Sequence, residues 1–220
     1  SGTSSLHLSN NKEGVPLKNK YLKAFEYSDC WIEDSRLVVL NARDAEIRGA
    51  KINVRTKVVS AEQINGIWHL TLHSIIDDAK RVVKAKMIVN AGGPWVEDII
   101  QNKVRLNSSE GVRLVRGSHL ITKKLYEHNK CYFFQGEDGR IIFTIPYETD
   151  FTLIGTTDVE HFDISIKPEC TLEEKKYLVN FASEYFETKV TIDDIVKTYS
   201  GVRPLYNDNA STASAATRDY

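Results

Sequence analysis

The segment from Lys86 to Glu97, Lys-Met-Ile-Val-Asn-Ala-Gly-Gly-Pro-Trp-Val-Glu, constrains the fold more than any other stretch of the chain. The apolar, β-branched run from Met87 to Ala91 predicts a buried strand. The two glycines allow a tight turn because neither has a Cβ atom, and Pro94 suits the first turn of a following helix. In α/β proteins, such a strand-to-helix turn brings bare backbone N–H groups to a cofactor. An ordinary connecting turn is the competing interpretation.

The composition of the 220 residues, 41% hydrophobic and 27% charged, is that of a globular protein. A net charge of −1 provides no basic field for nucleic acid or an anionic membrane. The first residues given do not show the charged-then-apolar pattern of a signal peptide, and no apolar run approaches 18 residues. Cys30, Cys131 and Cys170 are widely spaced, which favours a reducing compartment and predicts neither a metal site nor a disulfide framework. Both ends, Ser1 and Tyr220, look cut, so we expect a piece of a longer protein.

The region before residue 50 is predicted to contain a loop, an aromatic segment and one helix. Residues 1–20 are polar and predict the loop, and the aromatic side chains of residues 21–31 predict a segment packed on the main body. Asp34 is a candidate N-cap for a helix that runs to Arg48 and ends at Gly49. The inner face of this helix would consist of Leu37, Val38, Asn41, Ala42 and Ala45.

Residues 54–90 alternate with the period of β-strands and predict a three-stranded antiparallel meander. Asn65-Gly66 is a strong hairpin signal because both residues tolerate the positive φ angles of a tight turn, and Asp77-Asp78 predicts the second turn. The last strand would lead into the Met87–Ala91 run.

The chain beyond residue 112 predicts an antiparallel sheet backed by one helix, an α+β arrangement. The helix would extend through Phe186, with Thr171 as N-cap and Glu174 completing a capping box. Turn residues 136–139 predict a hairpin tip. The predicted strands cover residues 114–122, 131–135, 140–146, 151–157 and 196–205.

Polar residues interrupt the apolar strands of this second half. His119 is a lone histidine in one strand, and Arg203 lies between a glycine and a proline in another. Arg203 and Arg218, if adjacent, would clamp a phosphate or carboxylate. The alternatives are a salt bridge of Arg203 to Asp158 or a helix carboxylate, a hydrogen-bonded core histidine at 119, and ordinary surface positions for Arg218 and residues 156–158. These patterns alone predict an anion-binding protein and no reaction.

Six motifs occur in order: Phe25–Trp31, Val89–Trp95, Arg116–His119, Ile154–Asp158, Tyr199–Leu205 and Thr217–Tyr220. Together they closely resemble the FAD-dependent, quinone-linked glycerol-3-phosphate dehydrogenases. The resemblance covers almost the whole chain, and its specificity comes from the six motifs together. The sequence departs from the family at Gly92, where the family usually has threonine.

The resemblance implies part of a two-domain FAD oxidoreductase of the D-amino-acid-oxidase type. Residues 1–112 would be the remainder of the FAD-binding domain, and residues 113–220 the substrate-binding sheet domain. The implied reaction moves hydride from C2 of glycerol 3-phosphate to flavin N5, giving dihydroxyacetone phosphate, and passes electrons to a quinone. The implied location is cytoplasmic and peripheral to the inner membrane. A homodimer is a candidate assembly, and the near-zero net charge predicts no nucleic-acid partner.

The resemblance also implies roles for single residues. His119 would be the base or orient the substrate hydroxyl, Arg203 would hold the substrate and stabilise the developing oxyanion, and Arg218 would help to hold the phosphate. The cofactor would lie along Asn90, Ala91, Gly92, Gly93, Pro94, Gly201 and Val202, with its adenine end near Thr56, Lys57 and Val58. We expect His119 and Arg203 to lie beside a common pocket facing the Gly92–Gly93 bend.

No G-x-G-x-x-G motif occurs in the 220 residues, and the family's C-terminal helical region is also absent. We therefore expect this chain alone to hold FAD weakly and not to turn over. The Met87–Ala91 strand would lack its parallel neighbours and form an exposed sheet edge. The competing interpretations are a glycerol-3-phosphate oxidase that uses oxygen, an amino-acid or sarcosine oxidase of the same fold, and a non-catalytic anion-binding lobe.

Overall fold

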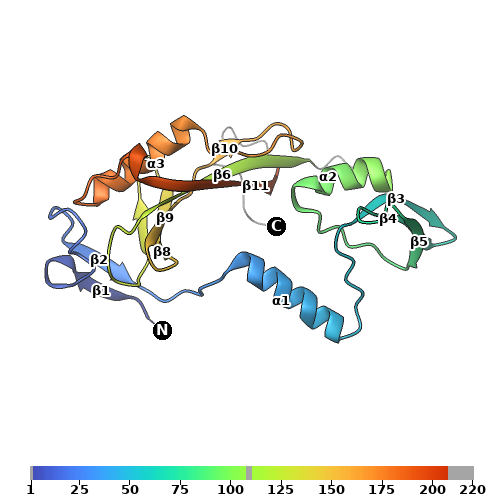
Figure 1. Ribbon diagram of the computed structural model, residues 1–220, viewed down its shortest axis with the longest axis horizontal. Helices are drawn as coiled ribbons and strands as arrows, with labels where there is room; N and C mark the ends of the chain where they lie inside the picture. The colour runs from blue at the N-terminus through green and yellow to red at the C-terminus, as the bar shows by residue number, and fades with distance from the viewer. Residues whose placement is uncertain (1, 108–110, 208–220) are drawn as a thin grey trace. The chain divides into compact units, whose positions relative to one another are not determined.

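The computed structural model describes residues 2–107 and 111–207, which form two compact units (Figure 1). Of the described residues, the first unit contains 27–107, and the second combines 2–26 with 111–207. The two longest described helices have 14 residues each, and no described helix is long and apolar enough to cross a membrane.

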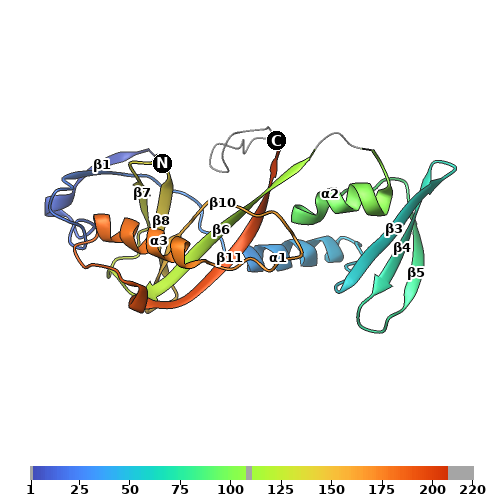
Figure 2. The same cartoon turned by 90° about the horizontal axis from the view of Figure 1, so that it is seen from above.

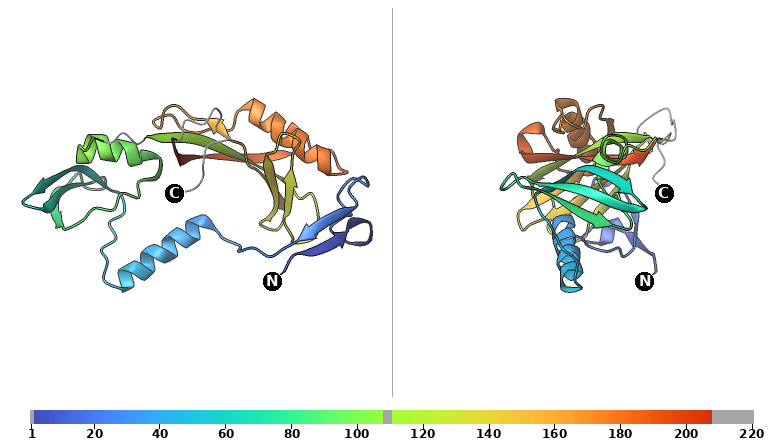
Figure 3. Two further views of the ribbon diagram at one scale, coloured as in Figure 1. Left: turned by 180° about the vertical axis from the view of Figure 1, so that it is seen from behind. Right: turned by 90° about the vertical axis from the view of Figure 1, so that its right-hand side faces the viewer.

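The first unit contains the predicted antiparallel meander, in which β3 (Thr56–Ile64), β4 (Ile67–Ser74) and β5 (Lys80–Ala85) lie side by side (Figure 3). Both predicted turns are confirmed. Asn65 and Gly66 have φ angles of 49° and 79°, the two positive values that a two-residue hairpin turn requires. Asp78, in the second turn, has a φ of 57°.

The predicted strand at Met87–Ala91 is wrong. The third strand ends at Ala85, and the side chains of Met87 and Val89 are 76% and 82% exposed. A strand needs a neighbour to satisfy its backbone N–H and C=O groups, and no described segment pairs with these residues. The predicted helix start does follow, as η2 (Gly93–Trp95), α2 (Val96–Asp98) and η3 (Ile99–Val104) in direct succession.

Helix α1 (Asp34–Ile47) has nearly the predicted length, but its predicted cap and inner face are wrong. The N-cap is Glu33, which makes no side-chain capping bond, and Asp34 is the first helical residue. No α1 residue is buried by the described residues, and Val38 of the expected inner face is 67% exposed. Gly49 follows the helix with a φ of 98°, a left-handed conformation that suits glycine at a helix end.

The second unit is built on an antiparallel sheet in which one long strand, β6 (Val112–Lys123), occupies the centre (Figure 2). Along one edge, β6 pairs with β11 (Ile195–Tyr206). Along the other edge it pairs with β9 (Phe151–Gly155) and β10 (Val159–Glu160). Strands β8 (Ile141–Tyr147) and β7 (Tyr132–Gln135) extend the sheet beyond β9. The predicted strands and antiparallel arrangement are confirmed.

Helix α3 (Leu172–Tyr185) covers one face of this sheet (Figure 1). The predicted capping box is confirmed: Thr171 Oγ1 accepts from the Glu174 N–H at 3.2 Å, and Glu174 accepts from the Thr171 N–H at 2.9 Å. Leu178 and Phe181 pack into the core, as the helical period predicts. A short turn, η4 (Ile192–Asp194), leads from the helix region into β11.

Residues 2–26 pack with the second unit, and not with the first as the expected boundary at residue 112 required. They contain β1 (Ser4–His7) and η1 (Leu8–Asn10), where a loop was predicted, and β2 (Lys23–Glu26), within the predicted aromatic segment. The physical reason is burial, since Leu8 and Leu17 are 5% and 6% exposed within the core beneath α3. Of the aromatic segment, Tyr21 stacks on Tyr185, but Phe25 and Trp31 are 75% and 63% exposed.

Candidate active site

His119 and Arg203 project from the same face of the β6–β11 strand pair. The two strands are antiparallel, with His119 opposite Tyr199, Gly117 opposite Gly201 and Val115 opposite Arg203. Directly opposed residues project to the same face, and every second residue along a strand returns to it. The structure thus brings together two predicted site residues that are distant in the sequence. We call this side of the sheet the His119 face.

The imidazole of His119 is held between an aromatic ring and a glycine. It stacks on Tyr199, with ring centroids 4.8 Å apart and an interplanar angle of 7°. On the other side, His119 is paired with Gly155 of β9. A Cβ atom at position 155 would lie 2.2 Å from His119 Cδ2, so only glycine leaves room for the ring as it lies here.

The guanidinium of Arg203 is anchored at the end of β9. Nη1 donates to Asp158 Oδ1 at 3.1 Å and to the Thr157 carbonyl at 3.3 Å, and Nη2 donates to Thr156 Oγ1 at 3.0 Å. The alternative of a salt bridge to Asp158 is therefore confirmed. The Arg203 side chain is 32% exposed, so this pairing fixes its direction without burying it completely. The guanidinium lies over Gly117, where a Cβ atom would be 2.4 Å from both Nη atoms.

Gly201 marks open space on the His119 face. It lies on β11 opposite Gly117, and no atom of the described residues is within 4 Å of the position that its Cβ would occupy. Its backbone has no left-handed φ that would call for glycine. Glycine weakens a strand interior unless another group approaches the backbone closely. Because the Arg203 guanidinium covers Gly117, Gly201 is the glycine of this pair that leaves bare backbone beside His119 and Arg203, suited to a flat ring or a small polar substrate.

Asn90 organises the bend at residues 90–94 in the first unit. Its Oδ1 accepts from the Gly92 N–H at 3.1 Å, and its Nδ2 donates to the Val96 carbonyl at 3.0 Å. Gly93 has a φ of 55°, and no described atom lies within 4 Å of its Cβ position. The backbone at Gly93 is therefore open to close approach.

The remaining predicted cofactor residues lie on strands or in the same bend. Ala91 is exposed and Pro94 begins the helical segment. Thr56, Lys57 and Val58 begin β3, with Thr56 Oγ1 donating to the Val54 carbonyl at 3.1 Å. Val202, next to Arg203 on β11, is paired with Arg116 and projects to the opposite face.

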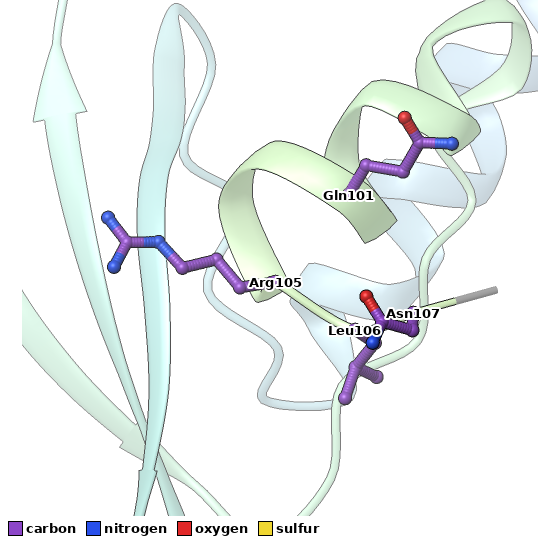
Figure 4. Close-up of a pocket in the computed structure, with 4 residues that line it drawn as sticks. All are labelled: Gln101, Arg105, Leu106 and Asn107. Carbon is purple, nitrogen blue, oxygen red and sulfur yellow. The ribbon is translucent and has the colours of Figure 1, made fainter.

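Two predicted features of the site are not located by the described residues: the position of Arg218 and a pocket beside His119. Arg218 lies outside the described residues. A pocket of about 390 Å³ at the end of η3 is lined by Gln101, Arg105, Leu106 and Asn107, with the Arg105 side chain directed away from the other residues (Figure 4). None of the predicted site residues lines this pocket. The placement of the Asn90–Pro94 bend opposite the His119 face stays a prediction.

Sequence reasoning missed one residue beneath the site, Glu174, which it assigned only to the capping box. The Glu174 side chain is 5% exposed, and its carboxylate accepts bonds from Ser118 and Arg116 of β6 and from Thr157. Burial raises its pKa, but the bonds from Thr171, Thr157, Ser118 and Arg116 together outweigh burial, so the pKa lies below its ordinary value. One sequence signal could have indicated a buried partner such as Glu174. Arg116 and Ser118 alternate with His119 along one strand, so polar side chains project to both of its faces.

Residues 4–217 match the family described as FAD dependent oxidoreductase, and the chain belongs to that family. This match confirms the predicted D-amino-acid-oxidase type of fold. Among similar proteins, the glycerol-3-phosphate dehydrogenase of Pseudomonas tolaasii is 45% identical over 219 residues, which are 100% of this chain and 42% of the relative. The D-erythritol 1-phosphate dehydrogenase of Brucella abortus (strain 2308) is 43% identical over 100% of this chain and 44% of its own length.

A solved structure supports the same assignment. The glycerol-3-phosphate dehydrogenase of Bacillus halodurans, in complex with FAD, matches with a TM-score of 0.79 and 26% identity, covering 94% of this chain and 45% of that protein. The predicted resemblance to glycerol-3-phosphate dehydrogenases is confirmed. The chain spans less than half the length of these relatives.

The described residues fit the flavin that this family uses. Gly201 has an open side that the chain itself does not fill, and Gly93 presents an approachable backbone in a bend braced by Asn90. Both features suit the close approach of a ring or a phosphate to the main chain. Neither glycine is needed for packing among the described residues.

Proposed function

We propose that the protein containing this chain oxidises glycerol 3-phosphate to dihydroxyacetone phosphate with FAD as cofactor. Its similarity to glycerol-3-phosphate dehydrogenases over its full length supports this assignment. The observation that carries the proposal is the joint presence of His119 and Arg203 on one sheet face, beside the bare backbone of Gly201.

Oxidation of a secondary alcohol removes a hydride from carbon and a proton from oxygen. When bound, FAD supplies the hydride acceptor. His119 accepts the proton of the C2 hydroxyl or orients that hydroxyl, with its ring plane fixed by Tyr199. Arg203 holds the same oxygen and stabilises the negative charge that develops on it, because its guanidinium is oriented beforehand by Thr156 and Asp158.

The substrate phosphate requires a further cation, and we assign this role to Arg218. The resemblance of Thr217–Tyr220 to the family motif supports the assignment. A relative named D-erythritol 1-phosphate dehydrogenase, 43% identical, makes a longer polyol phosphate the second candidate substrate. Both substrates share a terminal phosphate and a neighbouring secondary hydroxyl. The residues proposed to bind the hydroxyl and the phosphate of one substrate would therefore bind the same groups of the other.

The electron acceptor and assembly are proposed from the resemblance alone. Electrons pass to a quinone, the enzyme is cytoplasmic and peripheral to the inner membrane, and two copies form a homodimer. Reduction of a soluble ubiquinone analogue without formation of hydrogen peroxide would support a quinone as the electron acceptor. Stoichiometric peroxide in aerated buffer would instead identify an oxidase, and membrane fractionation and light scattering test the other two statements.

The central experiment uses the full-length protein loaded with FAD and a dye as electron acceptor. We expect the enzyme to oxidise glycerol 3-phosphate and to show no activity on amino acids or sarcosine. Comparing its kcat/KM for glycerol 3-phosphate and for erythritol 1-phosphate would rank the two candidate substrates. H119N should lower kcat/KM about 10²- to 10⁴-fold, the usual contribution of a general base. H69N, on the meander strand β4, is the matched control and should change it less than about twofold. Activity on an amine and none on a polyol phosphate would contradict the proposal.

We further propose that the 220-residue chain alone neither binds FAD tightly nor turns over. The absence of a G-x-G-x-x-G phosphate cradle from its sequence supports this expectation. Purification with added FAD tests it, and a yellow complex of one FAD per chain would overturn it.

A further inference from the structure

Strand β6 presents its two faces to two different environments. Gly117 and His119 project to the His119 face, and Arg116 and Ser118 project to the face that α3 covers. Ser118 is completely buried, and its hydroxyl meets the carboxylate of Glu174 from α3. A movement of the strand on the α3 side would therefore be transmitted to His119, the next residue.

The Glu174 carboxylate uses both oxygens to accept hydrogen bonds. Oε1 accepts from Ser118 Oγ and from Thr157 Oγ1, both at 2.7 Å. Oε2 accepts from Arg116 Nη2 and from the Thr171 N–H, both at 2.9 Å. Only the Thr171 bond belongs to the capping box of the helix. The other three bonds fix segments that lie outside α3.

Those segments lead directly to the two proposed site residues. The Ser118 N–H donates to Thr157 Oγ1 at 2.9 Å, so β6 and the end of β9 are tied to each other as well as to Glu174. The Thr157 carbonyl accepts from Arg203 at 3.3 Å, and the next residue, Asp158, forms the ion pair with that guanidinium. Thr157 is 1% exposed, so its hydroxyl stays within this network.

We propose that Glu174 is a positioning residue for the oxidation reaction, holding the backbones beside His119 and Arg203 at a fixed separation from behind the sheet. The inference rests on the proposed function, because it concerns the spacing of those two groups. A buried carboxylate suits the task, since it accepts four bonds without donating any. An amide in its place would turn an N–H donor toward groups that donate.

The test compares E174Q with E173Q in the full-length enzyme. Glu173 is the adjacent, exposed acid in the same first turn of α3, so its variant removes an equal charge from the helix start without touching the network. For E174Q we expect kcat per bound flavin to fall about 10-fold and kcat/KM for glycerol 3-phosphate about 10- to 100-fold, as expected for misplacement of reacting groups by fractions of an ångström. E173Q should stay within about twofold of the wild type.

A second pair separates positioning from folding. T157V keeps the shape of the side chain and loses its hydroxyl, and T157S keeps the hydroxyl. We expect T157V to lose kcat per bound flavin as E174Q does, and T157S to regain most of it. Hydrogen–deuterium exchange of residues 113–123 should rise in E174Q and T157V, and not in E173Q or T157S.

The outcomes are distinct. A merely structural Glu174 would lower the melting temperature or flavin content of E174Q while leaving kcat per bound flavin unchanged, and that result overturns the inference. Equal loss in T157V and T157S also overturns it. If the wild-type enzyme oxidises no polyol phosphate, the proposed function fails and this inference fails with it.

Discussion

Replacing Gly117 by alanine tests the geometry of the His119 face most directly. The added Cβ would lie 2.4 Å from Nη1 and Nη2 of Arg203, and 2.6 Å from Cζ. Ordinary contact between such atoms begins at about 3.5 Å, so the guanidinium must retreat by about 1 Å. Its bonds to Thr156 and Asp158, at 3.0 and 3.1 Å, would then exceed hydrogen-bonding distance.

The expected magnitudes differ for stability and for catalysis. Bonds to a charged group contribute roughly 1.5–3 kcal/mol each, but the guanidinium of Arg203 is about one-third exposed, and solvent screening reduces their sum to about 1–2 kcal/mol. The lower chain entropy of alanine offsets about 0.5–1 kcal/mol of this loss. We therefore expect G117A to lower the free energy of unfolding by only about 1 kcal/mol. Displacing a group that stabilises a developing oxyanion should lower kcat about 10²- to 10³-fold.

Gly201→Ala is the matched variant, since Gly201 is the direct partner of Gly117 and its added Cβ meets no described atom. We expect its free energy of unfolding to be unchanged or higher by about 0.5 kcal/mol. FAD affinity or kcat/KM should nevertheless fall, because the methyl group enters the space assigned to the ligand. Urea unfolding followed by circular dichroism, flavin titration and steady-state kinetics measure these quantities in the full-length protein.

Two results would refute this reasoning. If G117A keeps kcat/KM within about twofold of the wild type, Arg203 does not act from its position over Gly117. If G201A changes neither FAD affinity nor kcat/KM, the open space over Gly201 is not ligand space.

Three further predictions concern the supports of the site. T171A removes the capping box of α3 and should lower the free energy of unfolding by about 1 kcal/mol in urea. Asn90→Asp keeps the acceptor for the Gly92 N–H but loses the donor to Val96, so flavin titration should show weaker binding, weaker still in N90A. Because the folded-state pKa of Glu174 lies below its ordinary 4.5, this carboxylate stabilises the fold above that pH, and the contribution is lost as pH falls further. Denaturation at several pH values should therefore show a steeper loss below pH 4.5 for the wild type than for E174Q.

Local signals predicted those elements whose cause is local. The Asn65-Gly66 turn and the capping box of Thr171 and Glu174 depend on residues within a few positions of one another, and both have the predicted geometry. The strand at Met87–Ala91 and the inner face of α1 failed for the opposite reason. Apolar periodicity indicates which side of an element should be buried, but not which segment buries it. Among the described residues, none covers Val38 or Val89.

Strand patterns predicted the candidate site residue by residue but not as an arrangement, and only the family resemblance implied that His119 and Arg203 share a pocket. His119 and Arg203 were evident as polar interruptions of apolar strands, and Asp158 as a partner of Arg203. Their common face depends on the pairing of β6 with β11, which single-strand patterns do not specify. The roles of Gly117 and Gly155, which make room for a guanidinium and an imidazole, follow only from that pairing.

The register of β11 against β6 is therefore the property on which the site depends. A slip by one residue would carry Arg203 to the other face, where the Glu174 carboxylate already holds Arg116, and would leave the His119 face without its cation. The one irregularity in the pairing lies between Ile195 and Lys197, before any of the site pairs, so the alternation from residue 198 to residue 206 is unbroken. Bonds on both faces oppose a slip: Ser118 contacts Ser200 at 2.8 Å on the α3 side, and His119 stacks on Tyr199 on the other. The network around Glu174 thus stabilises the same register that places His119 and Arg203 together.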